Sequence, residues 1–149
     1  MTRLLAIDPG GKGAGETGIV LLEYSAAHPA TLVYSWAQPG GLDGWLVWYD
    51  ELRVVADVVV CEHFVNRNVP GADLTPCFIE GSVRTLYRDA VLQGASGKNT
   101  AVSDDVLKRL GLWFTGDHHH DRNEAARHGI WYLKKHGHIP TLKAGWPNE

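Results

Sequence analysis

The chain has 149 residues, of which 44% are hydrophobic and 21% charged, so it suits one globular domain with a single core. No apolar run approaches the length of a membrane span, and no basic stretch followed by an apolar one opens the chain. These features exclude a membrane-spanning helix and lead us to expect a cytoplasmic protein. Cys61 and Cys77 form no CxxC pair and have apolar neighbours, so we expect two buried, reduced thiols.

The formal net charge is −3, but it is unevenly distributed. Residues 1–80 carry four basic and ten acidic side chains, whereas residues 81–149 carry ten basic and seven acidic ones. Such asymmetry allows a basic face on an acidic protein. The charge therefore weakens the case for a nucleic-acid partner without excluding it.

Three β-strands are expected at the start of the chain. Short runs rich in β-branched and aromatic residues and bounded by turn residues are typical of strands. The runs cover residues 3–8, 17–25 and 31–37. Because a turn region over residues 25–30 joins the last two, the three strands are predicted to form an antiparallel meander.

A helix and a buried strand follow. Residues 41–55 have helical spacing, with an apolar stripe that we expect to lie in the core. The stripe consists of Leu42, Trp45, Leu46, Tyr49 and Leu52. Residues 57–61 are almost entirely apolar, which is typical of a parallel strand covered on both faces, and this strand ends on Glu62.

The second half of the chain is predicted to alternate helices with one short strand. A polar loop over residues 64–73 precedes a helix with Pro76 in its first turn, where a missing N–H costs little. Ser103 caps a later helix, and Gly137 ends the last one. The expected elements are helix 74–89, strand 90–93, loop 94–101, helix 103–110 and helix 119–136. The element order predicts an α/β protein whose mixed sheet is flanked by helices.

Four carboxylates are the strongest candidates for chemistry. Asp8 and Glu62 each end a predicted strand, and neighbouring strands would bring them to one edge of the sheet. Asp121 and Glu124 are three residues apart on the last long helix, so they share one face. Close carboxylates cannot all stay ionised without cations, and all-oxygen ligation suits Mg²⁺ or Mn²⁺. Two such ions could activate a water for phosphodiester cleavage.

Each carboxylate also has an ordinary structural interpretation. Asp8 precedes Pro9-Gly10 and could cap a turn. Glu62 could pair with Arg67. Asp121 and Glu124 could simply be first-turn acids that interact favourably with the helix dipole. The ordered set of a strand Asp, a strand Glu and an acidic pair opening a late helix favours a metal site.

Four segments carry a resemblance to a known family: AIDPG…TGIVLL, VVVCEHF, VLQGASGKN…SDDVLKRLG and HDRNEAARHGIWYL. With them the chain resembles the RuvC-type Holliday-junction resolvases of the RNase H-like superfamily, particularly the compact phage-type versions. The resemblance covers most of the chain. It implies a single RNase H-like nuclease domain over residues 1–149, with a mixed five-stranded sheet of three antiparallel and then parallel strands.

The resemblance also implies an activity. A homodimer would resolve four-way DNA junctions by paired nicks, using two divalent metal ions per active site and no nucleotide cofactor. By position, the metal-binding and catalytic residues would be Asp8, Glu62, Asp121 and Glu124. The setting would be DNA recombination and repair in the cytoplasm of a bacterium or a phage-infected host cell.

The chain departs from the family pattern at three places. Glu124 stands where the family commonly has Asp, so its side chain is one methylene longer. The stretch between Gly10 and Thr17 is longer and richer in glycine than usual. Phe64 lies near the position of an aromatic residue that wedges into the junction, with its register left open.

Contacts with DNA are expected from cationic and polar side chains near the carboxylates, because phosphate contacts fix the register of a bound duplex. The candidates are Lys12, Phe64, Arg67, Lys98, Asn99 and Arg122. Lys98, in a glycine-containing loop, is the best placed of them. The run His118 to His120 cannot direct three neighbouring side chains at one ion; His120 is a candidate for proton transfer, against a merely solvent-exposed alternative.

Three other functions compete with junction resolution. The segment DPGGKGAGETG could be a phosphate loop of an actin-like ATPase, but that fold needs two duplicated domains and this chain is too short for them. A nuclease acting on RNA–DNA hybrids or flaps would use the same fold. A catalytically inactive DNA-binding relative is the third alternative, and the intact acidic set argues against it.

Overall fold

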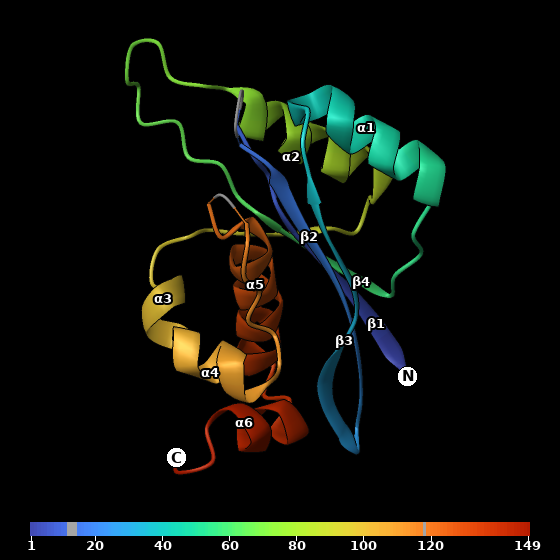
Figure 1. Cartoon of the computed structure of the whole chain (residues 1–149), viewed down its shortest axis with the longest axis vertical. Helices are drawn as coiled ribbons and strands as arrows, with labels where there is room; N and C mark the ends of the chain where they lie inside the picture. Colours follow the sequence, from blue (N-terminus) through green and yellow to red (C-terminus); the bar gives the residue numbers. More distant parts are fainter. Residues whose placement is uncertain (12–14, 118) are drawn as a thin grey trace.

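The computed structural model describes residues 1–11, 15–117 and 119–149. Lys12 and His118, both considered above, lie outside the described residues. The elements are β1 (Thr2–Asp8), β2 (Thr17–Ser25), β3 (His28–Gln38), α1 (Gly41–Leu52), β4 (Val58–Glu62), α2 (Thr75–Leu86), β5 (Val91–Gln93), α3 (Lys98–Ala101), α4 (Asp104–Arg109), α5 (Asp121–Lys135) and α6 (Ile139–Gly145) (Figure 1).

The five strands form one mixed sheet in the order β3-β2-β1-β4-β5. The β1/β2 and β2/β3 pairs are antiparallel, whereas the β1/β4 and β4/β5 pairs are parallel. Helices α1 and α2 cover one face, and α5 lies on the other with α3, α4 and α6 around it (Figure 1). The predicted α/β fold class and the mixed five-stranded sheet are confirmed.

Two apolar cores form because residues of β1 alternate between the two faces of the sheet. Leu4 and Ala6 pack towards α5, whereas Leu5 and Ile7 pack towards α1 and α2. All four side chains are fully buried. This central strand therefore reads as a continuous apolar run, and Asp8 is the first polar residue after it.

The buried face of α1 differs from the predicted stripe. Trp45 is buried as expected, but Leu46 and Leu52 are 37% and 46% exposed. Trp48 is buried instead, because it stacks on Trp45 at 5.1 Å between ring centroids and meets Trp36 of β3 edge-on at 5.3 Å. The aromatic contact with β3 sets which side of α1 faces the sheet.

Other expectations need correction. Cys61 is buried, but Cys77 is exposed on the outer side of α2, so only one of the two thiols lies in the core. Part of the expected 94–101 loop forms the short helix α3, and α6 follows where no element was predicted. Strand β3 begins at His28, so the turn after β2 is shorter than expected.

Helix α6 depends on contacts with the β2–β3 hairpin. Ala30 N donates to Thr141 Oγ1 at 2.9 Å, and a His138 ring nitrogen lies 2.8 Å from Ser25 O. His138 also caps the helix by accepting from Thr141 N. None of the described helices is both long enough and apolar enough to cross a membrane.

Candidate active site

Asp8 and Glu62 meet at one edge of the sheet, as expected from their strand-end positions. Strands β1 and β4 run parallel, with Ile7 paired to Cys61, so the next residue of each strand emerges at the same end. The two carboxyl groups are hydrogen bonded. Burial, together with the hydrogen bond and the charge of Glu62, raises the pKa of Asp8 well above its usual value.

Lys98 and Glu124 complete the cluster from the α5 side of the sheet. Lys98 Nζ lies 3.1 Å from Glu62 Oε1 and 2.7 Å from Glu124 Oε2. The Lys98 side chain is only 14% exposed. Although burial alone would raise it, the pKa of Glu62 falls below its usual range, because the Asp8 carboxyl and the His128 ring lie against it and Lys98 is positively charged. We call Asp8, Glu62, Lys98 and Glu124 the carboxylate cluster.

His128 contacts Glu62, and Gln93 in turn contacts His128. The fully buried His128 lies on α5, with Nε2 3.4 Å from Glu62 Oε1 and Nδ1 2.8 Å from Gln93 Nε2. An amide nitrogen only donates, so Nδ1 accepts and the ring proton is on Nε2, facing Glu62. The sequence placed His128 on the Glu124 face without giving it a partner, and Gln93 ended the short strand with no assigned role.

Asp121 lies on α5 one turn before Glu124, in different surroundings. Burial raises its pKa, and the neighbouring charges that act on it are those of Glu16, His119 and Asp117. Its Oδ2 atom is buried and has no hydrogen-bond partner among the described residues. The structure therefore joins three of the four predicted carboxylates: Asp8 is hydrogen bonded to Glu62, and Lys98 bridges Glu62 and Glu124. Asp121 has other charged neighbours and lies outside this set.

The predicted Pro9-Gly10 and Thr17-Gly18 motifs have a local explanation. Gly10 N donates to Thr17 Oγ1 at 3.1 Å, which closes the loop after β1. A Cβ at Gly18 would lie only 2.0 Å from the Asp121 carbonyl oxygen. Glycine at this position therefore allows the first turn of α5 to abut β2 and to bring its acids to the sheet edge.

The donor set fits a hard divalent cation. Within the described ranges, no three His, Cys, Asp or Glu side chains are already arranged to hold a metal ion. However, carboxylate oxygens of Glu62 and Glu124 converge on one positively charged atom, Lys98 Nζ, and Asp121 has an unpaired buried oxygen on the first turn of α5. All-oxygen donors of this kind are the ligands that Mg²⁺ and Mn²⁺ prefer.

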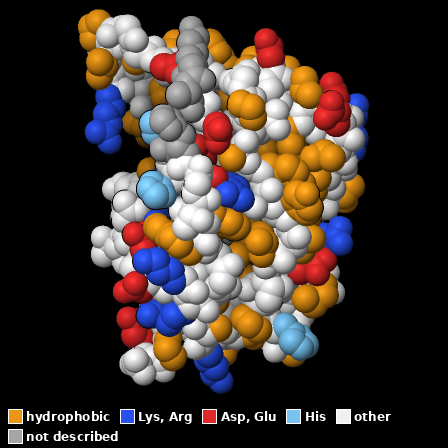
Figure 2. Space-filling model, in the orientation of Figure 1, with side chains coloured by type: hydrophobic (Ala, Val, Ile, Leu, Met, Phe, Trp, Pro, Cys, Tyr) orange, Lys and Arg blue, Asp and Glu red, His pale blue; other side chains and the backbone are white. Residues whose placement is uncertain are grey.

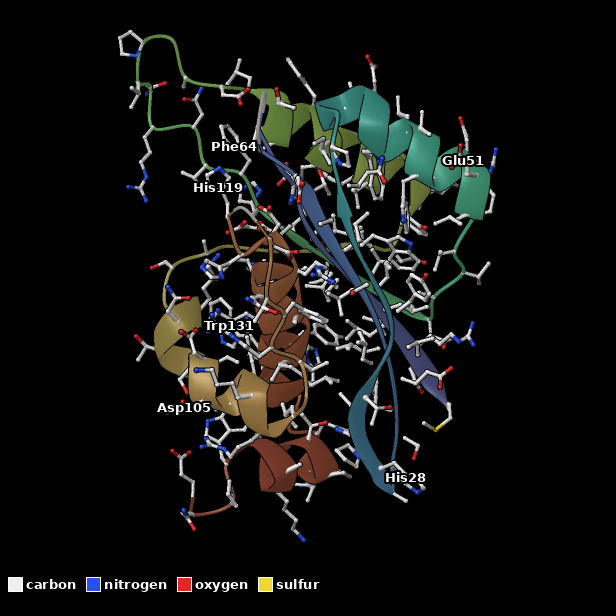
Figure 3. The ribbon with its side chains drawn as sticks, viewed as in Figure 1. His28, Glu51, Phe64, Asp105, His119 and Trp131 are labelled. Atoms are coloured by element: carbon white, nitrogen blue, oxygen red, sulfur yellow. The ribbon has the colours of Figure 1, made fainter. Side chains whose placement is uncertain are left out.

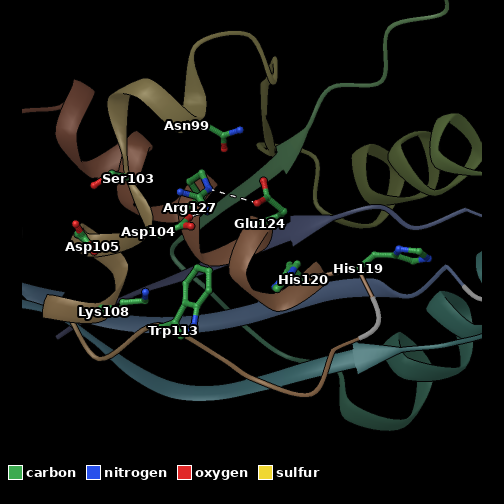
Figure 4. Close-up of a pocket in the computed structure, with 10 residues that line it drawn as sticks. All are labelled: Asn99, Ser103, Asp104, Asp105, Lys108, Trp113, His119, His120, Glu124 and Arg127. Carbon is green, nitrogen blue, oxygen red and sulfur yellow. Dashed lines mark hydrogen bonds and ion pairs between the residues drawn. The ribbon is translucent and has the colours of Figure 1, made fainter.

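Two cavities flank the cluster. One, of about 850 Å³, opens beside Glu124 between α3, α4 and the start of α5 (Figure 4). Its lining comprises Asn99, Ser103, Asp104, Asp105, Lys108, Trp113, His119, His120, Glu124 and Arg127. The other, of about 350 Å³, lies between Glu62 and the loop that carries Phe64 and Arg67. Figure 2 shows the surface hollowed beside this protruding loop.

The residues expected to contact DNA differ in their exposure and in their contacts within the protein. Arg67 and Asn99 are exposed, and Phe64 is half-buried with its backbone N–H held by Glu80 at 3.0 Å. Arg122 is bonded internally, with Nη2 2.7 Å from Asp117 Oδ1 and its guanidinium over the Phe114 ring. Lys98 is likewise engaged within the protein. In Figure 3, Phe64 and His119 lie on one side of the molecule, and Glu51, at the end of α1, lies on the opposite side.

His120, the proton-transfer candidate, is exposed at the N-cap of α5. Its ring centroid is 5.9 Å from that of Trp113, and its Nδ1 lies 3.3 Å from Asn123 Nδ2. It lines the larger cavity with Glu124.

No family model and no curated protein matches the sequence. Solved structures match over almost the whole chain. RuvC of Thermus thermophilus in complex with a Holliday junction substrate superposes with a TM-score of 0.65 at 13% identity, covering 91% of this chain and 97% of that one. The same bacterium's RuvC in another structure gives a TM-score of 0.60 at 14% identity, covering 91% and 96%.

A viral protein gives a similar result. The Fowlpox virus resolvase in complex with substrate Holliday junction DNA has a TM-score of 0.57 at 14% identity, covering 89% of this chain and 99% of that one. This chain has the RuvC fold. In this RuvC fold the carboxylate cluster lies where the parallel strands β1 and β4 end against the first turns of α5.

Proposed function

We propose that the protein is a metal-dependent endonuclease that resolves four-way DNA junctions by paired nicks. One observation carries the proposal: in a RuvC fold, Lys98 pairs with both Glu62 and Glu124 where the parallel strands end, and Asp8 lies against Glu62. We assign residues 1–149 to a single nuclease domain, acting as a homodimer in the cytoplasm of a bacterium or a phage-infected host.

The proposed metal ligands are Asp8, Glu62, Asp121 and Glu124, holding two Mg²⁺ or Mn²⁺ ions per active site. When bound, such ions activate a water and stabilise the leaving oxygen of a phosphodiester. The protein's own part is to orient the ligands. His128 directs its Nε2 proton at Glu62, and Gln93 fixes that tautomer by donating to Nδ1.

The DNA is proposed to lie across the two cavities that flank the cluster. Arg67 and Asn99 are exposed at their rims and would contact phosphates. Phe64 would insert at the branch point, on a backbone that Glu80 holds in place. Lys12, Lys98 and Arg122 stay in the proposed contact set, although the last two must first give up internal partners.

The test compares substrates and variants. Labelled four-way junction, duplex, single-stranded and RNA–DNA hybrid substrates are incubated with Mg²⁺, with Mn²⁺ and with chelator. We expect symmetric, ligatable nicks in the junction that need the metal. Asp8→Asn and Glu62→Gln should each lower the rate by about 100-fold or more, since even the outer partners of a metal site are worth about 10- to 100-fold.

Glu51→Gln is the matched control, because Glu51 is an exposed glutamate at the end of α1. It should cut junctions at the wild-type rate. Cleavage of the hybrid alone would replace the proposal with the RNA–DNA hybrid nuclease. Junction binding without metal-dependent cleavage would instead favour the inactive DNA-binding relative.

A further inference from the structure

Lys98 differs from a solvent-exposed lysine that is free to bind a DNA phosphate, because its side chain is 14% exposed and already has partners within the protein. It opens the four-residue helix α3, and its side chain is more buried than those of its two glutamate partners. An ammonium group is expensive to bury unless charged partners compensate it. Here Glu62 and Glu124 do so at 3.1 and 2.7 Å, from a strand end and from a helix.

The cluster in turn needs a cation. Asp8, Glu62 and Glu124 are close enough for their charges to act on one another, and Lys98 is the lysine whose charge acts on Asp8 and Glu62. A divalent ion held by the same carboxylates would supply that charge itself. Two cations that share the same oxygens repel each other, so we expect the divalent ion to displace the ammonium.

We propose that Lys98 is a positioning residue that acts as an internal counter-ion: it holds Glu62 and Glu124 together in the metal-free protein and leaves them when a divalent metal binds. Ammonium and metal then compete for the same oxygens. The inference rests on the proposed metal binding and adds what this chain does before the metal arrives.

The surroundings allow the ammonium to leave without disturbing the fold. Gly97, just before Lys98, has a φ of 84°, and an added Cβ would meet nothing within 4 Å. The far end of α3 is fixed, because Lys134 Nζ donates to Ala101 O and Arg127 donates to Val102 O. In this proposal the Lys98 side chain rotates while α3 stays in place. The freed charge would remain beside Asn99 at the cavity rim, where a DNA phosphate could neutralise it.

The first test measures metal binding without DNA. Mn²⁺ is titrated calorimetrically into wild type, Lys98→Met and the control Lys143→Met, whose lysine is exposed on α6. Methionine keeps the length of the stem but removes the competing charge. We expect Lys98→Met to bind Mn²⁺ about tenfold or more tightly, because the competing ion pair is gone. Lys143→Met should match wild type.

Mn²⁺ affinity in Lys98→Met that is equal to or weaker than in wild type would overturn the inference while leaving the proposed function standing. A wild-type protein that binds no Mn²⁺ would instead contradict the proposed function itself. The two failures are therefore distinguishable.

The second test uses wild-type protein alone, so it does not depend on how the variant folds. Lysine amines are labelled with an acylating reagent at fixed pH, in chelator and in saturating Mg²⁺, and the modified sites are quantified by mass spectrometry. We expect Lys98 to be labelled more slowly than Lys143 in chelator and severalfold faster once Mg²⁺ is bound. Labelling of Lys98 that stays the same or slows with Mg²⁺ would rule out its release.

Discussion

Gly18 lies where the start of α5 comes closest to the sheet. An added Cβ would be 2.0 Å from the Asp121 carbonyl oxygen, 2.4 Å from its carbonyl carbon and 3.0 Å from Arg122 N. All three atoms belong to the backbone, so no side-chain rotation can make room. Any larger residue must push the first turn of α5 away from β2, and Asp121 and Glu124 move with it.

We expect Gly18→Ala to lower the free energy of unfolding by about 1–3 kcal/mol, the usual cost of overpacking a tight site. Urea denaturation measures it. Gly81→Ala is the control, because Gly81 lies in α2 and its added Cβ meets nothing within 4 Å. Alanine there should raise the stability by about 0.5–1 kcal/mol through its higher helix propensity. Equal effects at the two sites would contradict the close approach.

At the scale of elements, Tyr87 ties the end of α2 to the segment after α1. Its hydroxyl donates to Val54 O at 2.9 Å, and its ring meets Tyr49 edge-on at 5.6 Å. Burial first, and then the neighbouring Tyr49, raises the pKa of Tyr87 to about 12 from 10. The folded protein therefore favours the neutral phenol.

This raised pKa predicts an alkaline loss of stability. Between about pH 10 and pH 12 the unfolded chain releases the Tyr87 proton while the folded chain keeps it, so stability falls as the pH rises. The contribution is fully present below pH 10. Urea denaturation from pH 9 to pH 12 should show a shallower decline in Tyr87→Phe than in wild type. If the stability of both proteins fell equally with pH, the Tyr87 hydroxyl would be exposed to water and not bonded to Val54 O.

The same scale shows which elements the sequence could predict. Strands β1 and β4 were predictable because both faces of each are covered, so their apolar runs are unbroken. Helices α3 and α6 were missed because four and seven residues are too few to show a helical period. Helix α6 is instead defined by distant contacts with the β2–β3 hairpin, such as that between Thr141 and Ala30.

The candidate site was predictable to the same extent. Asp8 and Glu62 follow from the strand ends, and Glu124 follows from helical spacing once α5 is placed on the sheet. The burial of Lys98 was not predictable, because its partners Glu62 and Glu124 are far away in sequence. The His128–Gln93 contact joins residues 35 positions apart and needs the β5 register to be known.

At the scale of the whole molecule, paired nicks need paired sites. The described residues of one chain form one carboxylate cluster, whereas the proposed reaction cuts two of the four strands of a junction, so a twofold-symmetric dimer is the simplest assembly. We expect sedimentation equilibrium at micromolar concentration to give twice the chain mass of 16.4 kDa. A monomeric mass with and without junction, in protein that still cuts it, would contradict the dimer.

The carboxylate cluster combines residues from the early and late parts of the chain. Asp8 is the last residue of the first strand, whereas Glu124 lies on the last long helix. Synthesis on the ribosome runs from the first residue to the last, so the sheet acids are made early and Glu124 late. A growing chain therefore carries no complete cluster until most of its length exists. If the proposed function holds, products that end before α5 lack Glu124 and should show no metal-dependent cleavage of junctions.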